Sequence, residues 1–168
     1  MLGEVDEVEI KRIDEEIDAL WYDLECAQDS WGCGCPLAVE IGRRMNERIS
    51  TLERLEVSKK TAKRLKEAGK YDDAMHMLKA EAKRHPGNEK LYSGWMSDVM
   101  AGKLTSRMKK DARPDELRNI RKAWRKYAAK AGIMADPSLE ASYQVYRSSY
   151  VEKGNGKVPM RRSCGWYM

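Results

Sequence analysis

The apolar residues of this chain recur at helical intervals along most of its length. In the N-terminal segment, Ile13, Ile17, Leu20 and Leu24 follow one another at spacings of four, three and four. A helix with 3.6 residues per turn places such residues on one stripe. The same periodicity predicts helices over about residues 4–28, 36–56, 58–69, 71–85, 114–132 and 137–151. Because none of these stripes has the alternating period of a strand, we expect an all-α helical bundle.

The glycines and prolines between these stripes indicate how the helices are joined. Gly32, Gly34 and Pro36 separate the first two segments, so a tight turn should connect them as an antiparallel N-terminal helical hairpin. Its acidic first helix is expected to face Arg43, Arg44, Arg48 and Arg54 of the second. The sequence predicts a hairpin over 1–56, a helical domain over 57–153 and a C-terminal tail over 154–168, or alternatively one compact domain overall.

A helix-turn-helix unit over about residues 55–88 has a recognisable spacing. Its small and large apolar positions and its closing proline are Ala62, Leu65, Ala74, Leu78 and Pro86, with the turn at 69–74. The unit resembles a tetratricopeptide repeat (TPR), a family that spaces such residues along two antiparallel helices. It departs from the family at Ser58, where Trp is preferred, and at Glu81, where Ala is preferred. Since one repeat cannot bury its own apolar face, we expect residues 89–101 to cover it.

The TPR-like resemblance implies a binding surface. In the family, the first helix of each hairpin lines a groove that binds peptides or partner helices. Lys59, Lys63 and Lys66 fall at the corresponding positions and would favour an acidic protein segment. The alternative is a solvated lysine face without a partner.

The charge of the chain is strongly uneven. Its net charge is +5, yet residues 1–30 hold eleven acidic and two basic side chains, so the remainder is strongly basic. Residues 102–130 hold eleven Lys or Arg against three acids. On the helix that begins at residue 114, the cations predicted to lie opposite the apolar stripe in one continuous row are Arg118, Arg121, Lys122, Arg125 and Lys126. Such a row suits an acidic protein surface or the phosphate backbone of DNA or RNA.

Three of the four cysteines surround the first turn. Cys26, Cys33, Cys35 and Cys164 could bind zinc if the tail folded back, could form a disulfide, or could remain reduced thiols. Because two cysteines separated by one residue share a metal ion poorly, we expect reduced thiols and no bound metal.

The remaining observations concern the class of function. The sequence has no run of about 18 apolar residues and no basic, then apolar leader, so we expect no membrane partner and a cytoplasmic protein. It also has no nucleophile motif and no phosphate-binding glycine loop. The sequence therefore predicts a non-catalytic, cofactor-free binding protein that engages an acidic protein surface as an adaptor, inhibitor or assembly subunit. A nucleic-acid-binding accessory protein is the first alternative, and a small metal-dependent enzyme is the second.

Overall fold

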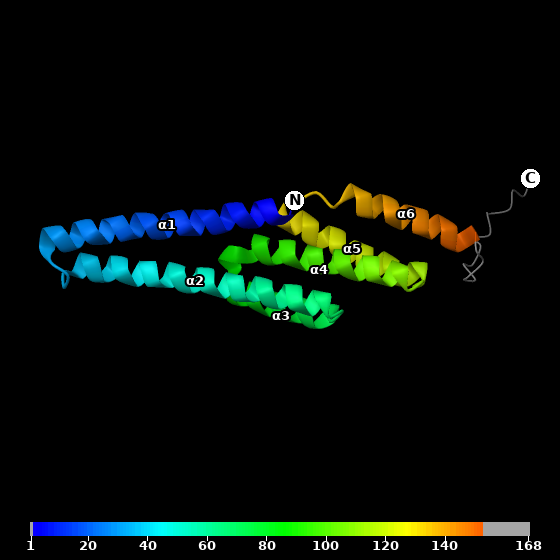
Figure 1. The fold of residues 1–168 in the computed structure, drawn as a ribbon, viewed down its shortest axis with the longest axis horizontal. Helices are drawn as coiled ribbons and strands as arrows, with labels where there is room; N and C mark the ends of the chain where they lie inside the picture. The colour runs from blue at the N-terminus through cyan, green and yellow to red at the C-terminus, as the bar shows by residue number, and fades with distance from the viewer. Residues whose placement is uncertain (1, 153–168) are drawn as a thin grey trace, which may run out of the picture.

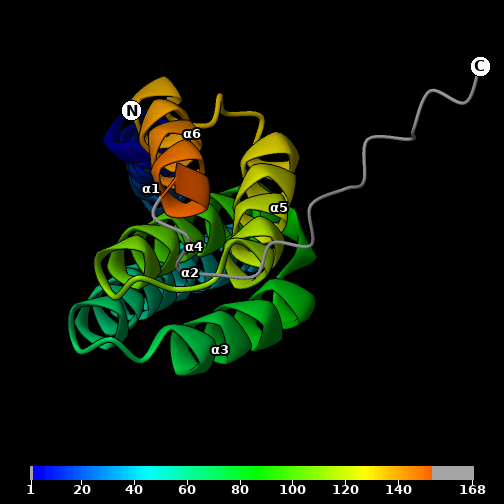
Figure 2. The same ribbon diagram turned by 90° about the vertical axis from the view of Figure 1, so that its right-hand side faces the viewer.

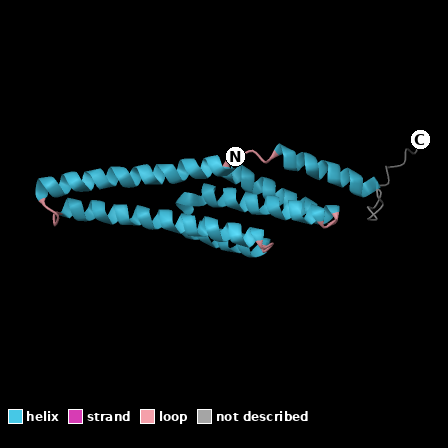
Figure 3. Cartoon of the chain, viewed as in Figure 1, coloured by secondary structure: helices cyan, strands magenta, loops and turns pink. Residues whose placement is uncertain are grey.

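A computed structural model describes residues 2–152 of the chain, with side chains from 7 to 150. Within that part the chain forms six α-helices and one 3₁₀ turn, with no strand (Figure 3), which confirms the all-α prediction. The elements are α1 (Leu2–Trp31), α2 (Pro36–Glu67), α3 (Tyr71–Arg84), η1 (Pro86–Asn88), α4 (Glu89–Lys109), α5 (Pro114–Ala131) and α6 (Pro137–Glu152). None of the helices in this range has the length and apolarity needed to cross a bilayer. The predicted tail over 154–168 lies outside the described residues.

The predicted N-terminal hairpin is present and is longer than expected. α1 and α2 run antiparallel, and the half of the hairpin nearest the turn extends beyond the other helices (Figure 1). The expected charge pairing between the two helices is mostly wrong. Arg48 does reach Glu16 of α1 at 3.0 Å. Arg43 and Arg44 instead pair with Glu40, one turn away on their own helix.

α2 corrects one helix boundary. We expected a helix end near residue 56 and a separate short helix from 58, whereas α2 continues without a break to Glu67. The buried residues of α2 change face along its length: Met45 packs towards α1, whereas Leu55 and Ala62 pack into the core with α3 and α4. Because α2 packs against different helices along its length, its apolar stripe moves around the helix. In the sequence, this movement resembles the end of one helix and the start of another. The predicted domain boundary between 56 and 57 therefore falls inside one helix.

The TPR-like unit consists of the second half of α2 and the whole of α3. Gly69 adopts a left-handed conformation with φ of 75°, which glycine enters without steric cost, and this turn reverses the chain. Ala62, Ala74 and Leu78 are buried between the helices, as their spacing predicts. α4 covers this apolar face, in agreement with the expected role of residues 89–101.

α4 is the central helix of the molecule. Its residues from 91 to 97 are all buried, so the helix is covered on every side along this stretch. In the view along the molecule, α1 and α2 lie at one side, α5 lies at the other, and α4 runs between them (Figure 2). This arrangement leaves one face of the α1–α2 hairpin and one face of α5 open to solvent.

Candidate interaction surface on helix α5

The sequence at each end of α5 explains where this helix begins and ends. Pro114 occupies the first turn, where its missing N–H costs nothing, and Asp115 and Glu116 favour the positive end of the helix dipole. Gly132 closes the helix in a left-handed conformation with φ of 71°. The buried face packs on α4, where Ser97 donates a hydrogen bond to the Trp124 carbonyl at 3.4 Å. α5 is thus a fixed support for the side chains on its other face.

Four cations lie on the exposed face of α5. We call them the α5 row; its members are Arg118, Lys122, Arg125 and Lys126. They span about 12 Å along the axis at 1.5 Å per residue. Arg118 Nη2 donates a hydrogen bond to Asp115 Oδ1, on its own helix, at 2.8 Å. Lys122 and Arg125 have no hydrogen bond or ion pair with any described residue. The row therefore presents charge that the described part of the chain leaves largely uncompensated.

Arg121 does not belong to this row, so the prediction of five exposed cations is wrong at that position. Its Nε donates to both carboxylate oxygens of Glu140 on α6, at 2.9 and 3.0 Å, and its Nη2 makes a further contact. The guanidinium also lies 5.2 Å from the ring centroid of Tyr143. Hydrogen bonding from Arg121 holds the pKa of Glu140 below its ordinary value. Arg121 thus attaches α6 to α5 rather than facing solvent.

The three lysines of the TPR-like unit are placed differently from one another. Lys59 and Lys63 are exposed on α2. Lys66 is half-buried and pairs with Asp98 of α4 at 2.7 Å, while its side chain lies over Gly102. The charge of Lys66 is therefore used within the fold, which leaves Lys59 and Lys63 as the exposed members of the predicted groove.

The cysteines near the first turn do not form a cluster of thiols. Cys35 caps α2: its Sγ accepts a hydrogen bond from the Ala38 N–H at 3.2 Å. Cys26 and Cys33 are exposed. Among the described residues, no three His, Cys, Asp or Glu side chains are grouped as metal ligands, and Cys164 lies outside that range.

A polar pocket between α2 and α3 was missed by the sequence analysis. Arg54 Nη1 lies 2.9 Å from His85 Nε2, and Glu81 lies 3.9 Å from the same imidazole nitrogen. Deeper in, Ser58 hydrogen-bonds to Tyr92, whose pKa is raised mainly by burial. The departures from the TPR pattern at positions 58 and 81 were the available signal, since both polar residues line this pocket.

No protein-family description, no curated protein and no solved structure matches this chain. The TPR-like resemblance accordingly rests on the residues of one hairpin.

Proposed function

We propose that this protein is a non-catalytic binding protein, an adaptor, inhibitor or assembly subunit, that engages an acidic protein surface through the α5 row. The observation that carries the proposal is the row itself, which places four cations on one face of a well-supported helix. Two of them, Lys122 and Arg125, make no side-chain hydrogen bond or ion pair with a described residue, and Arg125 has only a longer-range electrostatic interaction with Glu140. Arginine offers carboxylates two parallel hydrogen bonds, so Arg118 and Arg125 suit a surface rich in Asp and Glu.

Two further features support a protein partner over nucleic acid. The row is short, and the exposed tryptophans of the described part of the chain, Trp21 and Trp31, lie on α1. The ring beside the row is that of Tyr127, which is half-buried. Single-stranded nucleic acids are bound by combining cations with aromatic side chains on which the bases stack. Binding to the nucleic-acid backbone is the alternative, and it is favoured only by the unpaired cations.

The two carboxyls with lowered pKa values on the surface, Glu40 and Asp72, have an explanation that involves no catalysis. Perturbed pKa values cluster at catalytic sites, where they tune acids and bases. Here the pKa of Glu40 is lowered to about 2 by hydrogen bonds from Arg43 and Arg44 on an exposed helix face. The pKa of Asp72 is lowered by its hydrogen bond from Lys103. Both shifts are explained by ion pairs on the surface of the fold.

The test measures binding of two labelled probes, poly-glutamate and a duplex or single-stranded DNA oligonucleotide, at two salt concentrations. The α5 variant Lys122→Glu with Arg125→Glu should lose poly-glutamate binding and keep its helical circular dichroism. The matched control Lys79→Glu with Lys83→Glu makes the same change in net charge at exposed positions of α3. This control should bind poly-glutamate like the natural chain.

Two results would overturn the proposal. Equal losses in the α5 and α3 variants would mean that the probe senses only total charge. Tighter binding of the oligonucleotides, with an affinity that falls steeply with salt and with the α5 substitutions, would establish the nucleic-acid alternative.

A further inference from the structure

The α1–α2 hairpin has one face that no other described helix covers. Successive residues of a helix are rotated by about 100°. The side nearest the rest of the molecule holds a depression lined by Glu16 and Ala19 of α1 and by Arg44 and Thr51 of α2. The residues on the opposite side of the two helices form what we call the outer face. They are Glu7, Asp14, Asp18, Trp21 and Glu25 of α1 and Val39, Gly42, Asn46, Ser50, Glu53, Val57, Lys60 and Arg64 of α2.

Large apolar side chains on the outer face are open to solvent. Trp21 is 55% exposed, Val39 is 62% exposed and Val57 is 63% exposed. Between them, Gly42 has no atom within 4 Å of the place where a Cβ would stand. Two helices alone can bury one narrow seam, and residues beside this seam, such as Leu24 and Ile49, are only half-buried. An exposed tryptophan next to an incompletely buried seam is typical of an interface.

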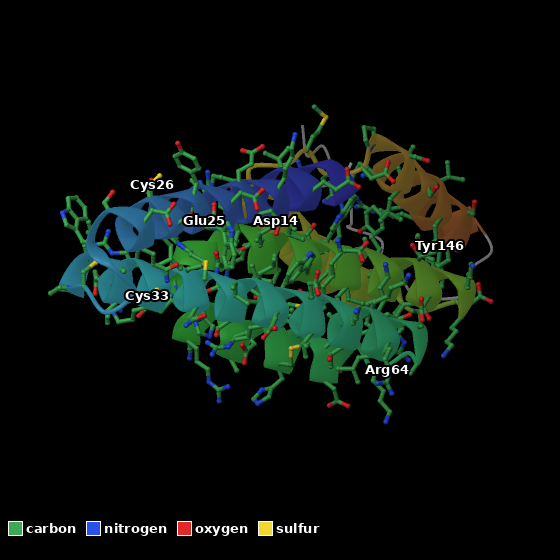
Figure 4. The ribbon with its side chains drawn as sticks, turned by 60° about the vertical axis from the view of Figure 1, so that its left-hand side comes forward. Asp14, Glu25, Cys26, Cys33, Arg64 and Tyr146 are labelled. Carbon is green, nitrogen blue, oxygen red and sulfur yellow. The ribbon has the colours of Figure 1, made fainter. Side chains whose placement is uncertain are left out.

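The charges on the outer face are separated along its length. Asp18 and Glu25 lie in the half near the turn, whereas Lys60 and Arg64 lie at the opposite end (Figure 4 labels Glu25 and Arg64). Asp14 and Glu53 lie between these two groups, and Glu7 lies at the same end as Lys60 and Arg64. The side chains of Asp18, Glu25, Lys60 and Arg64 have no ion pair or hydrogen bond within the described part of the chain. The end near the turn therefore carries unpaired negative charge, whereas at the opposite end the two cations outnumber the single carboxylate of Glu7.

We propose that the outer face binds the outer face of a second copy of this chain in an antiparallel, two-fold arrangement. A two-fold axis across the hairpin brings the acidic end of one copy over the basic end of the other, twice in each dimer. It also brings Trp21 towards the half of the partner that holds Val57. The result is a four-helix layer in which the seam of each hairpin is covered.

The dimensions of the hairpin fit such a dimer. α1 has 30 residues and is about 45 Å long at 1.5 Å per residue. Two helices side by side are about 20 Å wide, so each copy offers about 900 Å². A dimer would then bury about 1,800 Å² in total, which lies within the usual range of specific interfaces, about 1,200–2,000 Å².

Charge exchange between two variants gives a specific test. The first variant, Asp18→Lys with Glu25→Lys, makes both ends of the outer face basic. The second, Lys60→Glu with Arg64→Glu, makes both ends acidic. Sedimentation equilibrium of the natural full-length chain at micromolar concentrations should show a dimer. Each variant alone should dimerise about a hundredfold more weakly, because like charges then meet at both ends. An equimolar mixture of the two should recover the dimer, since each acidic end then meets a basic one.

Circular dichroism of each variant shows whether loss of the dimer is loss of folding, and recovery in the mixture excludes that explanation directly. Lys122→Glu with Arg125→Glu on α5 is the matched control and should dimerise like the natural chain. A monomeric natural chain, variants that dimerise unchanged, or a mixture that stays monomeric would overturn the proposal. So would loss of the dimer in the α5 control, because the acidic hairpin would then be docking on α5 of the other copy.

Discussion

Arg121 and Arg125 lie one turn apart on α5, yet their substitution should have opposite consequences. Arg121 is 24% exposed and pairs with Glu140, which is 30% exposed, whereas Arg125 is exposed and has no ion pair among the described residues. Arg121→Ala should therefore reduce stability and leave binding of acidic probes nearly intact. Arg125→Ala should reduce binding and leave stability nearly intact. The comparison tests which cations form the α5 row.

The geometry sets the size of the stability effect. Exposed ion pairs contribute about 0.2–1 kcal/mol, whereas removal of one partner from a fully buried pair costs about 3–5 kcal/mol. The Arg121–Glu140 pair is intermediate in burial and makes several charge-assisted hydrogen bonds. We expect Arg121→Ala to cost about 1–2 kcal/mol, whereas Arg125→Ala should change stability by less than about 0.5 kcal/mol. For a chain of this size the former lowers Tm by about 2–8 °C.

Urea denaturation followed by circular dichroism measures both variants, and a double-mutant cycle with Glu140→Ala isolates the pair. Glu140→Ala removes the carboxylate that Arg121→Ala leaves without its main partner, so the double variant should recover part of the loss. We expect a coupling free energy of about 0.5–1.5 kcal/mol between the two sites. Equal destabilisation by Arg121→Ala and Arg125→Ala, or zero coupling with Glu140→Ala, would refute the assignment of Arg121 as the residue that attaches α6.

Three further predictions follow from burial, capping and titration. Ala74 is 0% exposed, so Ala74→Leu should destabilise the fold by about 1–3 kcal/mol in thermal denaturation. The control Ala129→Leu, on the exposed face of α5, should be nearly neutral. Equal effects of the two substitutions would contradict the close packing at Ala74. Cys35→Ala should lower the stability by about 0.5–1 kcal/mol because it removes the cap of α2. Cys35→Ser should retain the stability, since a hydroxyl caps a helix at least as well as a thiol. A serine variant as unstable as the alanine variant would argue against capping. The pKa of Glu140 in the folded protein is lowered below its ordinary value of 4.5. The ion pair with Arg121 therefore stabilises the fold fully above pH 4.5, and this stabilisation is lost as the pH falls through the lowered pKa of the folded protein. The stability of the natural chain should therefore fall more steeply below pH 4.5 than that of Arg121→Ala, and parallel curves would contradict this.

Local pattern was sufficient for most of the fold. The helical period of apolar residues, the turn at Gly69, and the proline and glycine at the two ends of α5 are properties of short segments, and the structure has helices or turns at each of them. The buried face of α5 was predicted for the same reason, since Leu117, Ile120 and Trp124 fall on one side of any helix built from that segment. Burial at Ala74 was also predictable, because the spacing of the TPR-like unit places it between two helices.

The tertiary structure decides which charged side chains form ion pairs. Arg121 and Arg125 are indistinguishable along the sequence, and their difference arises because α6 returns 19 positions later and places Glu140 beside one of them. Lys66 is separated from Asp98 by 32 positions, and this pair forms only when α4 packs against α2. The continuity of α2 likewise depends on α1 and α4 covering different faces of the same helix. Helical periodicity is a short-range property that a segment carries with it, whereas the partner of a long charged side chain depends on which distant helix packs beside it.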